Sequence, residues 1–217
     1  MIELVYRRAE AARFVSRVIV ATDDRRIANA VERFGGHAVM TSPSHQSGTD
    51  RLAEVARTLD AGILVNVQGD EPLIEPAMID EALAPFGSDP ALQMTTLRRR
   101  IDSPAELANP NVTKIVVDSE GFALYFSRAP IPYTREGQPA APAWRHVGLY
   151  AYRRAALLRL AALPPTVLER AEALEQLRAL EHGIRIKAME TRFDTVGVDT
   201  QEDLERVRRM VTADARW

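Results

Sequence analysis

Short runs of consecutive apolar residues alternate along the chain with stretches whose apolar residues recur at helical spacing. The runs at 18–22 and 63–67 suit buried strands of a parallel sheet, because such strands are covered on both faces. Between them, apolar side chains at 27, 30, 31 and 34 share one face of a helix. This alternation predicts an α/β fold, in which a mostly parallel open sheet is flanked by helices.

The same pattern places the remaining elements. Helices are expected over residues 1–12, 52–59, 153–162, 169–181 and 200–211, and strands over 37–40, 94–99, 114–118, 123–127, 146–152 and 185–189. The strands crowd together in the middle of the chain. The sequence therefore predicts a β-rich segment within an otherwise alternating fold.

Turn-forming residues refine this organisation. Residues 119–121, Ser-Glu-Gly, stand where a hairpin turn would join two strands, and the four prolines between 130 and 142 indicate an exposed loop. No repeat or linker splits the chain. We predict a single α/β domain over residues 1–212 with a β-rich insertion at about 94–145, followed by a tail at 213–217.

Composition limits the partners that the chain can take. With 28 basic and 30 acidic residues, the net charge of −2 gives no bulk attraction to nucleic acid or an anionic membrane, and the arginines at 98–100 are expected to be a solvated strand end. The lack of cysteine excludes disulfides, zinc–thiolate sites and a thiol nucleophile. No apolar run approaches the roughly 20 residues of a membrane span. A cytoplasmic protein is expected.

The clearest candidate site is the polar run at 68–72, directly after a predicted strand. Ligands of open α/β sheets bind beyond the carboxyl ends of the strands. Gln68 offers an amide to a base or a ribose, Gly69 lets the backbone approach a ligand, and Asp70 is an oxygen ligand of the kind that Mg²⁺ prefers. A strand-to-helix turn with solvated carboxylates explains the same residues equally well.

A second carboxylate, Asp199, follows another apparent strand end. Because it would enter the same crevice as Asp70, the two carboxylates are expected to share one Mg²⁺ with substrate phosphates. Taken alone, Asp199 is better explained as part of a helix start. Thr200 and Asp203 have the spacing of a capping box, and acidic residues suit a helix N-terminus.

A polar loop at 45–51 precedes the helix predicted to start near Leu52. Helix N-terminal amides favour anions, and Arg51 adds a planar donor that suits phosphate or carboxylate. The alternative is an ordinary helix start, in which Thr49 or Asp50 caps the helix and Arg51 is solvated.

Polar groups also stand out in the second half of the chain. Arg128 ends a predicted strand, His146 begins another, and Glu175 and Gln176 interrupt a helix with leucine spacing. Each has a structural alternative: a surface ion pair for the arginine, a hydrogen-bonded structural role for the histidine, and a solvated helix face for the other two.

Read in order, these segments resemble the 3-deoxy-manno-octulosonate (Kdo) cytidylyltransferase family, a group of sugar nucleotidyltransferases that activate acidic sugars with CTP. The resemblance runs from about residue 1 to about residue 211. It is carried by VATD (20–23), HQSGTDR (45–51), VNVQGDEP (65–72), NPNVTK (109–114), ALYFSR (123–128), HVGLY (146–150), LEQLR (174–178) and GVDT (197–200). It implies Mg²⁺-dependent transfer of CMP from CTP to the anomeric hydroxyl of Kdo, with release of pyrophosphate, for lipopolysaccharide synthesis.

The resemblance also assigns residues by position. Cytidine would contact Gln46, Ser47, Gly48, Thr49, Arg51 and Gln68; Mg²⁺ and the catalytic centre would take Asp70 and Asp199; the acid sugar would contact Arg128, His146, Tyr150, Glu175 and Gln176. No side-chain nucleophile is expected, because nucleotidyl transfer needs a hydroxyl held in line and neutralised phosphate charge. The family is usually a cytoplasmic homodimer, with much of the contact supplied by the β-rich insertion.

The chain departs from the family at its start. The family normally opens with a strand and a Gly-containing loop that bears an arginine and a lysine and holds the triphosphate, and nothing here matches it. We expect the runs at 18–21 and 63–67 to lack a neighbouring strand. We also expect the 217-residue chain to have little cytidylyltransferase activity, either because roughly 30 residues precede it in the native protein or because it is a truncated relative.

Two other functions stay open. The chain could be a non-catalytic binder of a nucleotide or an acid sugar, which calorimetry beside a pyrophosphate assay would distinguish from an enzyme. It could also activate another acid sugar, such as a sialic acid, which a substrate panel would reveal.

Overall fold

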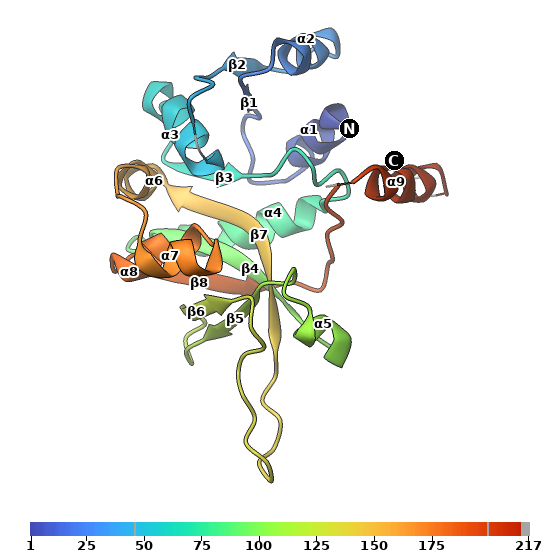
Figure 1. The fold of residues 1–217 in the computed structure, drawn as a ribbon. Coiled ribbons are helices and arrows are strands. Elements are labelled where there is room, and N and C mark those ends of the chain that lie inside the picture. Colours follow the sequence, from blue (N-terminus) through green and yellow to red (C-terminus); the bar gives the residue numbers. More distant parts are fainter. Residues whose placement is uncertain (46, 199, 214–217) are drawn as a thin grey trace. The chain divides into compact units, whose positions relative to one another are not determined.

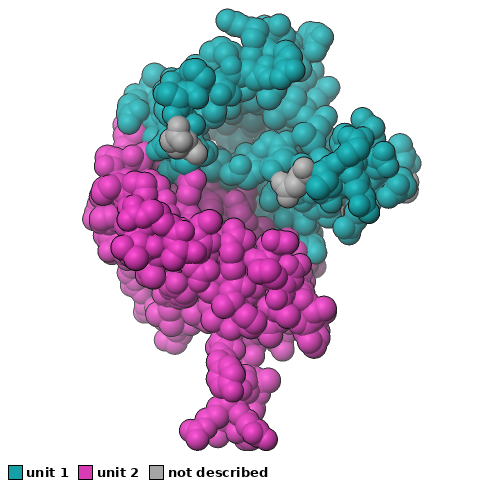
Figure 2. Space-filling model, in the orientation of Figure 1, with its two compact units in different colours: residues 1–61, 65–80, 193–217 teal, residues 62–64, 81–192 magenta. Residues whose placement is uncertain are grey.

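The computed structural model describes residues 1–45, 47–198 and 200–213 (Figure 1). The chain divides into two compact units, shown in different colours in Figure 2. Unit 1 comprises residues 1–61, 65–80 and 193–217, and unit 2 comprises residues 62–64 and 81–192. The single domain over residues 1–212, with an insertion at 94–145, stays a prediction.

Unit 1 consists of short helices and strands from both ends of the chain. Its elements are α1 (Ile2–Glu10), β1 (Val20–Thr22), α2 (Arg25–Arg33), β2 (Ala38–Met40), α3 (Gly48–Thr58) and α9 (Gln201–Ala213), and it shares β3 (Ile63–Asn66) and α4 (Pro76–Leu83) with unit 2. Strands β1 and β2 pair in parallel, and α2 packs against both.

Local sequence explains why α2 forms where it does. The carboxylate of Asp24 accepts the backbone N–H of Arg26 at 2.8 Å and so caps the first turn. Ala28 and Val31 are buried on one face of the helix. Gly35 follows it with φ of 79°, a conformation that favours glycine. The predicted helix is confirmed.

Unit 2 is built on a six-stranded mixed sheet. Its further elements are a 3-10 helix η1 (Ala84–Gly87), β4 (Met94–Arg100), α5 (Pro104–Ala108), β5 (Lys114–Val117), β6 (Ala123–Ser127), β7 (Trp144–Arg153), α6 (Arg154–Ala161), α7 (Val167–Glu172), α8 (Gln176–Glu181) and β8 (Ile186–Glu190). Five strands lie in the order β6-β5-β7-β4-β8, and β3 also pairs with β7. Strands β4 and β8 run parallel, whereas β4–β7, β5–β7 and β5–β6 are antiparallel.

The core of unit 2 follows from this arrangement. Strand β4 has neighbours on both edges, and the side chains of residues 94–97 are buried. Leu97, Leu149 and Leu157 are among the fully buried side chains, the last of them from α6. An α/β fold with helices beside a sheet is thus confirmed.

The β-rich segment has the hairpin that the sequence predicts. Strands β5 and β6 are joined by a turn in which Phe122 donates a backbone hydrogen bond to the carboxylate of Asp118 at 2.8 Å and Gly121 has φ of 83°. The proline-containing segment between β6 and β7 extends away from the sheet of unit 2 (Figure 1). Its Tyr133 is 88% exposed, as expected of an exposed loop.

Two predicted helices differ from the structure. The single helix expected over 169–181 is two helices, because Ala173 adopts a left-handed conformation with φ of 51° between α7 and α8. The helix expected from Leu52 begins at Gly48, since the hydroxyl of Ser47 accepts the N–H of Asp50 at 3.2 Å and caps it. The prediction of Thr49 or Asp50 as the cap is therefore wrong.

Within the described residues, no helix is both long and apolar enough to cross a membrane.

Candidate functional site

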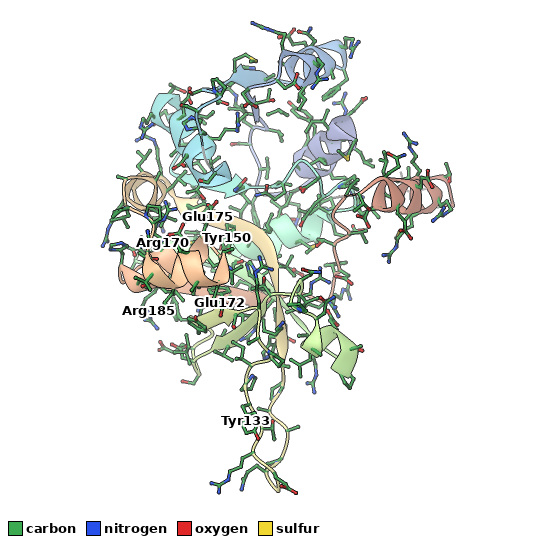
Figure 3. All side chains as sticks on the ribbon, viewed as in Figure 1. Tyr133, Tyr150, Arg170, Glu172, Glu175 and Arg185 are labelled. Carbon is green, nitrogen blue, oxygen red and sulfur yellow. The ribbon has the colours of Figure 1, made fainter. Side chains whose placement is uncertain are left out.

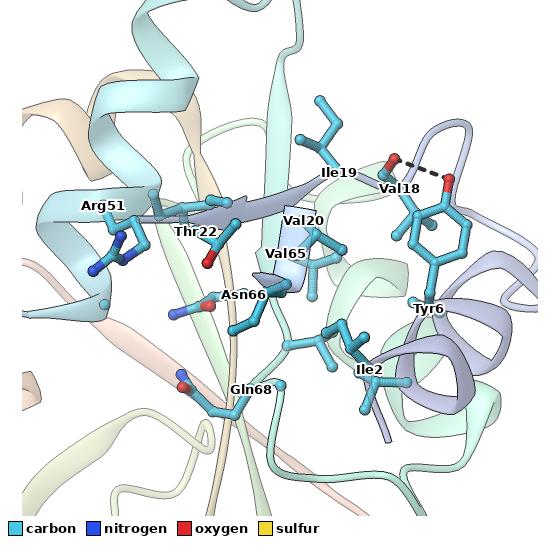
Figure 4. Close-up of a pocket in the computed structure, with 18 of the residues that line it drawn as sticks. Ile2, Tyr6, Val18, Ile19, Val20, Thr22, Arg51, Val65, Asn66 and Gln68 are labelled. Atoms are coloured by element: carbon cyan, nitrogen blue, oxygen red, sulfur yellow. Dashed lines mark hydrogen bonds between the residues drawn. The ribbon is translucent and has the colours of Figure 1, made fainter. Parts of the chain in front are cut away.

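A cavity of about 350 Å³ lies in unit 1 among β1, the residues after β3, and the starts of α1 and α3. Figure 4 shows polar side chains on one side of it and apolar side chains on the other: Arg51, Thr22, Asn66 and Gln68 against Ile2, Tyr6 and Val18. The polar side includes residues that directly follow a strand. This is the position at which α/β sheets bind ligands.

The cavity separates two strand edges. Strand β1 pairs with β2, β3 pairs with β7, and residues 18–22 and 65–67 line the cavity. The expectation that residues 18–21 and 63–67 would lack a neighbouring strand is wrong for one edge of each run, where β1 pairs with β2 and β3 pairs with β7, and holds within the described residues for the other edge. Residues of β1 and β3 line the cavity, and the two strands do not pair with each other.

The start of α3 contributes a glycine to the cavity wall. Gly48 lines the cavity, and a Cβ placed on it would lie 4.0 Å from the amide nitrogens of both Asn66 and Gln68. Ser47 is the cap of α3 and Thr49 is buried. The sequence-predicted Gln68, Gly48 and Arg51 thus line one cavity, whereas Gln46 lies outside the described residues.

Arg51 is held in place from two directions. Its Nη1 donates to the hydroxyl of Thr41 at 2.6 Å and lies 3.2 Å from the carboxylate of Asp23. The alternative of a solvated Arg51 is therefore wrong. A guanidinium oriented in this way at the cavity wall is suited to an anionic or polar ligand.

The two segments expected to hold a metal meet in unit 1. The backbone N–H of Val198 donates to the carbonyl oxygen of Asp70 at 2.9 Å, so the residue that precedes Asp199 lies against Asp70. Asp199 itself lies outside the described residues. Thr200 and Asp203 form the expected reciprocal capping contacts, at 3.1 Å from the Asp203 N–H to the Thr200 hydroxyl and 3.0 Å from the Thr200 N–H to the Asp203 carboxylate.

The donor chemistry at Asp70 fits Mg²⁺. Among residues 1–45, 47–198 and 200–213, no group of three or more His, Cys, Asp or Glu side chains could hold a metal ion. Such a group is not required, because proteins usually bind Mg²⁺ through one or two carboxylates together with substrate phosphates. Asp70 supplies one such carboxylate in the turn that follows β3.

In unit 2, His146 lies in a polar cluster on the sheet. Its Nε2 is 3.0 Å from the hydroxyl of Thr96, and its ring contacts Phe126 and Tyr150 at centroid distances of 5.0 and 5.3 Å. Burial, with a smaller contribution from the charge of Arg145, lowers the pKa of His146 to about 3. The imidazole is therefore neutral at physiological pH.

Tyr150 stays protonated in the same cluster. Burial raises the pKa of its phenol well above the ordinary value, and the nearby Tyr152 and Glu175 raise it further. Figure 3 shows Tyr150 and Glu175 close together in unit 2. The structure thus brings His146, Tyr150 and Glu175 to one part of this unit.

The two residues at the start of α8 differ in burial. Glu175 is exposed, whereas Gln176 is buried. The alternative of a solvated helix face therefore holds for Glu175 and is wrong for Gln176.

Arg128 links the residues before β5 to the end of α7 through hydrogen bonds. Its guanidinium donates to the carbonyl oxygens of Glu172 at 2.8 Å, Pro110 at 3.1 Å and Ala173 at 3.5 Å, and its backbone N–H donates to the Glu172 carboxylate at 2.9 Å. The alternative of a surface ion pair is too simple, since three of these contacts are to backbone. Its assigned contact with an acid sugar stays a prediction.

Sequence reasoning missed the environment of the arginines at 98–100. Arg98 stacks over the ring of Trp144 at 4.5 Å, and Arg99 forms an ion pair of 2.5 Å with Glu106. Arg100 alone among the three is exposed. The expectation of a solvated strand end is wrong for the first two, because pairing of β4 with β7 brings Trp144 beside Arg98, and α5 supplies Glu106 to Arg99.

Comparisons with known proteins agree with the sequence resemblance. Residues 1–186 match the cytidylyltransferase family. The 3-deoxy-manno-octulosonate cytidylyltransferase of Geobacter sulfurreducens is 55% identical, over 95% of this chain and 87% of that protein. Its counterpart from Trichlorobacter lovleyi is 53% identical, over 96% of this chain and 86% of that protein.

A solved structure shares both fold and sequence. The CMP:2-keto-3-deoxy-manno-octonic acid synthetase complexed with CTP superposes with a TM-score of 0.93 and 47% identity, over 98% of this chain and 87% of that chain. Identity at this level over 98% of the chain shows membership of a family, and not only a shared fold. The chain belongs to the cytidylyltransferase family, among its 3-deoxy-manno-octulosonate cytidylyltransferases.

Proposed function

We propose that the protein activates Kdo with CTP, giving CMP-Kdo and pyrophosphate for lipopolysaccharide synthesis. One observation carries the proposal: relatives that are 51–55% identical over at least 95% of this chain are named for this activity. The solved synthetase with CTP, at 47% identity, adds the nucleotide. The geometry of each unit supports a part of the reaction.

Unit 1 supports nucleotide binding. The amides of Asn66 and Gln68 beside Gly48 offer donors and acceptors to a cytosine or a ribose, and the absence of a side chain at Gly48 lets a ligand approach the backbone. Arg51, already oriented by Asp23, adds positive charge. The assigned contact of Gln46 with cytidine belongs to the same proposal.

Asp70 would hold Mg²⁺, together with Asp199. When bound, Mg²⁺ supplies positive charge that stabilises the phosphates during transfer. The chain holds Asp70 beside the residue that precedes Asp199, because the backbone N–H of Val198 donates to the carbonyl oxygen of Asp70.

Unit 2 supports binding of a polyhydroxylated acid. Neutral His146 and protonated Tyr150 are hydrogen-bonding groups without net charge, which suits hydroxyl recognition. Glu175, Gln176 and Arg128 complete the assigned sugar contacts. Because the attacking group is a hydroxyl of the substrate, these side chains need to orient it and need not act as nucleophiles.

The proposal extends to assembly and location. We include a homodimer in the cytoplasm, with contacts from the β-rich insertion, and no nucleic-acid or membrane partner. The exposed Tyr133 in the segment between β6 and β7 supports a contact there, since a large aromatic side chain on an extended loop suits an interface.

The test measures pyrophosphate release from CTP with and without Kdo, in the presence of Mg²⁺. We expect release that depends on Kdo, and a loss of about 100-fold in Asp70→Asn, equivalent to about 3 kcal/mol in the barrier. Asp60→Asn, which removes an exposed carboxylate in the same unit, is the matched control and should keep the rate.

Two outcomes would overturn this function. Calorimetric binding of CMP or Kdo, with no pyrophosphate release above background, would make the chain a non-catalytic binding protein. Faster turnover of a nine-carbon sialic acid than of Kdo would show that the sialic acid, and not Kdo, is the substrate. Unchanged Mg²⁺ dependence in Asp70→Asn would remove this carboxylate from the metal site.

A further inference from the structure

The hydroxyl of Thr96 has four polar neighbours in the interior of unit 2, one of which is the phenol of Tyr150. Its Oγ1 lies 2.9 Å from the carbonyl oxygen of Leu149, 3.2 Å from that of Val147 and 3.0 Å from Nε2 of His146. The side chain of Thr96 is fully buried, so water does not compete for these contacts.

Counting protons decides which group donates. A threonine hydroxyl carries one hydrogen, and a carbonyl oxygen can only accept. The hydroxyl proton of Thr96 must therefore point at Leu149 or Val147, since otherwise its lone pairs would face two carbonyl oxygens at close range. The remaining contact is satisfied when Nε2 of His146 carries a hydrogen and donates it to Thr96.

The second ring nitrogen of His146 is then an acceptor. A neutral imidazole carries one N–H, so protonation at Nε2 leaves Nδ1 with a free lone pair. Within the described residues, Nδ1 makes no hydrogen bond. It is not one of the fully buried polar atoms that lack a partner. Nδ1 is therefore an acceptor without a partner among the described residues, and it is not fully buried.

We propose that Thr96 is a positioning residue: it holds His146 as the Nε2-protonated tautomer, so that Nδ1 accepts a hydrogen bond from a hydroxyl of the acid sugar. The ring contacts with Phe126 and Tyr150 fix the plane of the imidazole, and Thr96 selects its tautomer. The role of the ligand rests on the proposed function. The tautomer itself does not.

The test begins with the free protein. Nuclear magnetic resonance of ¹⁵N-labelled histidine side chains identifies the tautomer at pH 7, and the signals of His146 are those lost in His146→Gln. We expect the Nε2-protonated form in the wild type and in Thr96→Ser, which keeps the hydroxyl. Thr96→Val, which keeps the shape, should give the other tautomer or a mixture. An Nδ1-protonated wild type would overturn the proposal before any variant is made.

Thr95→Val is the matched control. Thr95 is an equally buried threonine on the same strand, but its hydroxyl donates to the carbonyl of Ala82 at 2.7 Å. This variant should lose stability and leave the tautomer of His146 unchanged. If Thr96→Val and Thr95→Val give the same histidine spectrum, Thr96 has only a structural role.

Kinetics test the ligand contact. With the tautomer altered in Thr96→Val, the KM for Kdo should rise about tenfold, the KM for CTP should stay constant, and Thr96→Ser should restore the wild-type value. An altered tautomer with an unchanged KM for Kdo would overturn the contact at Nδ1. If the wild type does not turn over Kdo at all, the proposed function fails, whereas the tautomer measurement still decides the role of Thr96.

Discussion

Lowering the pH from 7 to 5 should destabilise the folded protein through His146. Burial, together with Arg145, lowers the pKa of this histidine in the folded state to about 3, compared with the ordinary value of 6.5. As the pH falls through 6.5, the unfolded chain takes up a proton that the folded protein does not. Stability contributed by the neutral imidazole is therefore fully present above pH 6.5 and is lost progressively as the pH falls toward 3.

The size of the effect follows from the same two values. Each unit of pH between them changes the free energy of unfolding by about 1.4 kcal/mol. Because the titration of the unfolded chain is centred at 6.5, the loss between pH 7 and pH 5 is about 2 kcal/mol. This is an upper value, since the ring of His146 is only partly buried.

Urea unfolding of the wild type and of His146→Gln isolates the contribution. Glutamine keeps an amide donor for Thr96 but does not titrate. The chain has four histidines, and the other three, together with all carboxylates, are the same in both proteins. The wild type should lose up to about 2 kcal/mol more than His146→Gln between pH 7 and pH 5. Parallel stability profiles for the two proteins would refute the reasoning.

Two further variants each test the contacts of one side chain, Lys114 in unit 2 and Arg51 in unit 1. Lys114→Met should lower the free energy of unfolding by about 2–4 kcal/mol in urea titrations. The buried ammonium donates to the carbonyl oxygens of Asn109 at 2.9 Å and Val112 at 2.6 Å, and the variant leaves both without this donor. A loss below about 1 kcal/mol would contradict this. Arg51→Lys should weaken CMP binding about fivefold by calorimetry, since Nη1 of Arg51 alone contacts Thr41 and Asp23 and leaves the other guanidinium nitrogens for a ligand, whereas lysine has a single nitrogen. An unchanged Kd would contradict it.

Elements that depend on local signals were predictable from the sequence. The apolar run that forms β1 and the glycine turn of the β5–β6 hairpin each carry their signal within a few residues. The break between α7 and α8 does not. Ala173 has no intrinsic preference for its left-handed conformation, and its surroundings include the guanidinium of Arg128, 45 residues away in the chain.

The candidate site divides in the same way. Gln68 and Asp70 stood out as candidates because they follow an apolar run, the position at which α/β sheets bind ligands. Thr96 was not, since a threonine in a strand is ordinary and its partner His146 is 50 residues away. The orientation of Arg51 also depends on Thr41, which only the fold brings beside it.

The bond formed in the reaction offers the most direct measurement. Kdo labelled with ¹³C at its anomeric carbon would be incubated with CTP, Mg²⁺ and the 217-residue chain, and the product examined by ¹³C and ³¹P nuclear magnetic resonance. We expect the labelled carbon to show coupling to one phosphorus, in a product formed in equal amount to pyrophosphate. Consumption of CTP with no coupling at that carbon, or binding of both substrates with no product, would contradict the assignment.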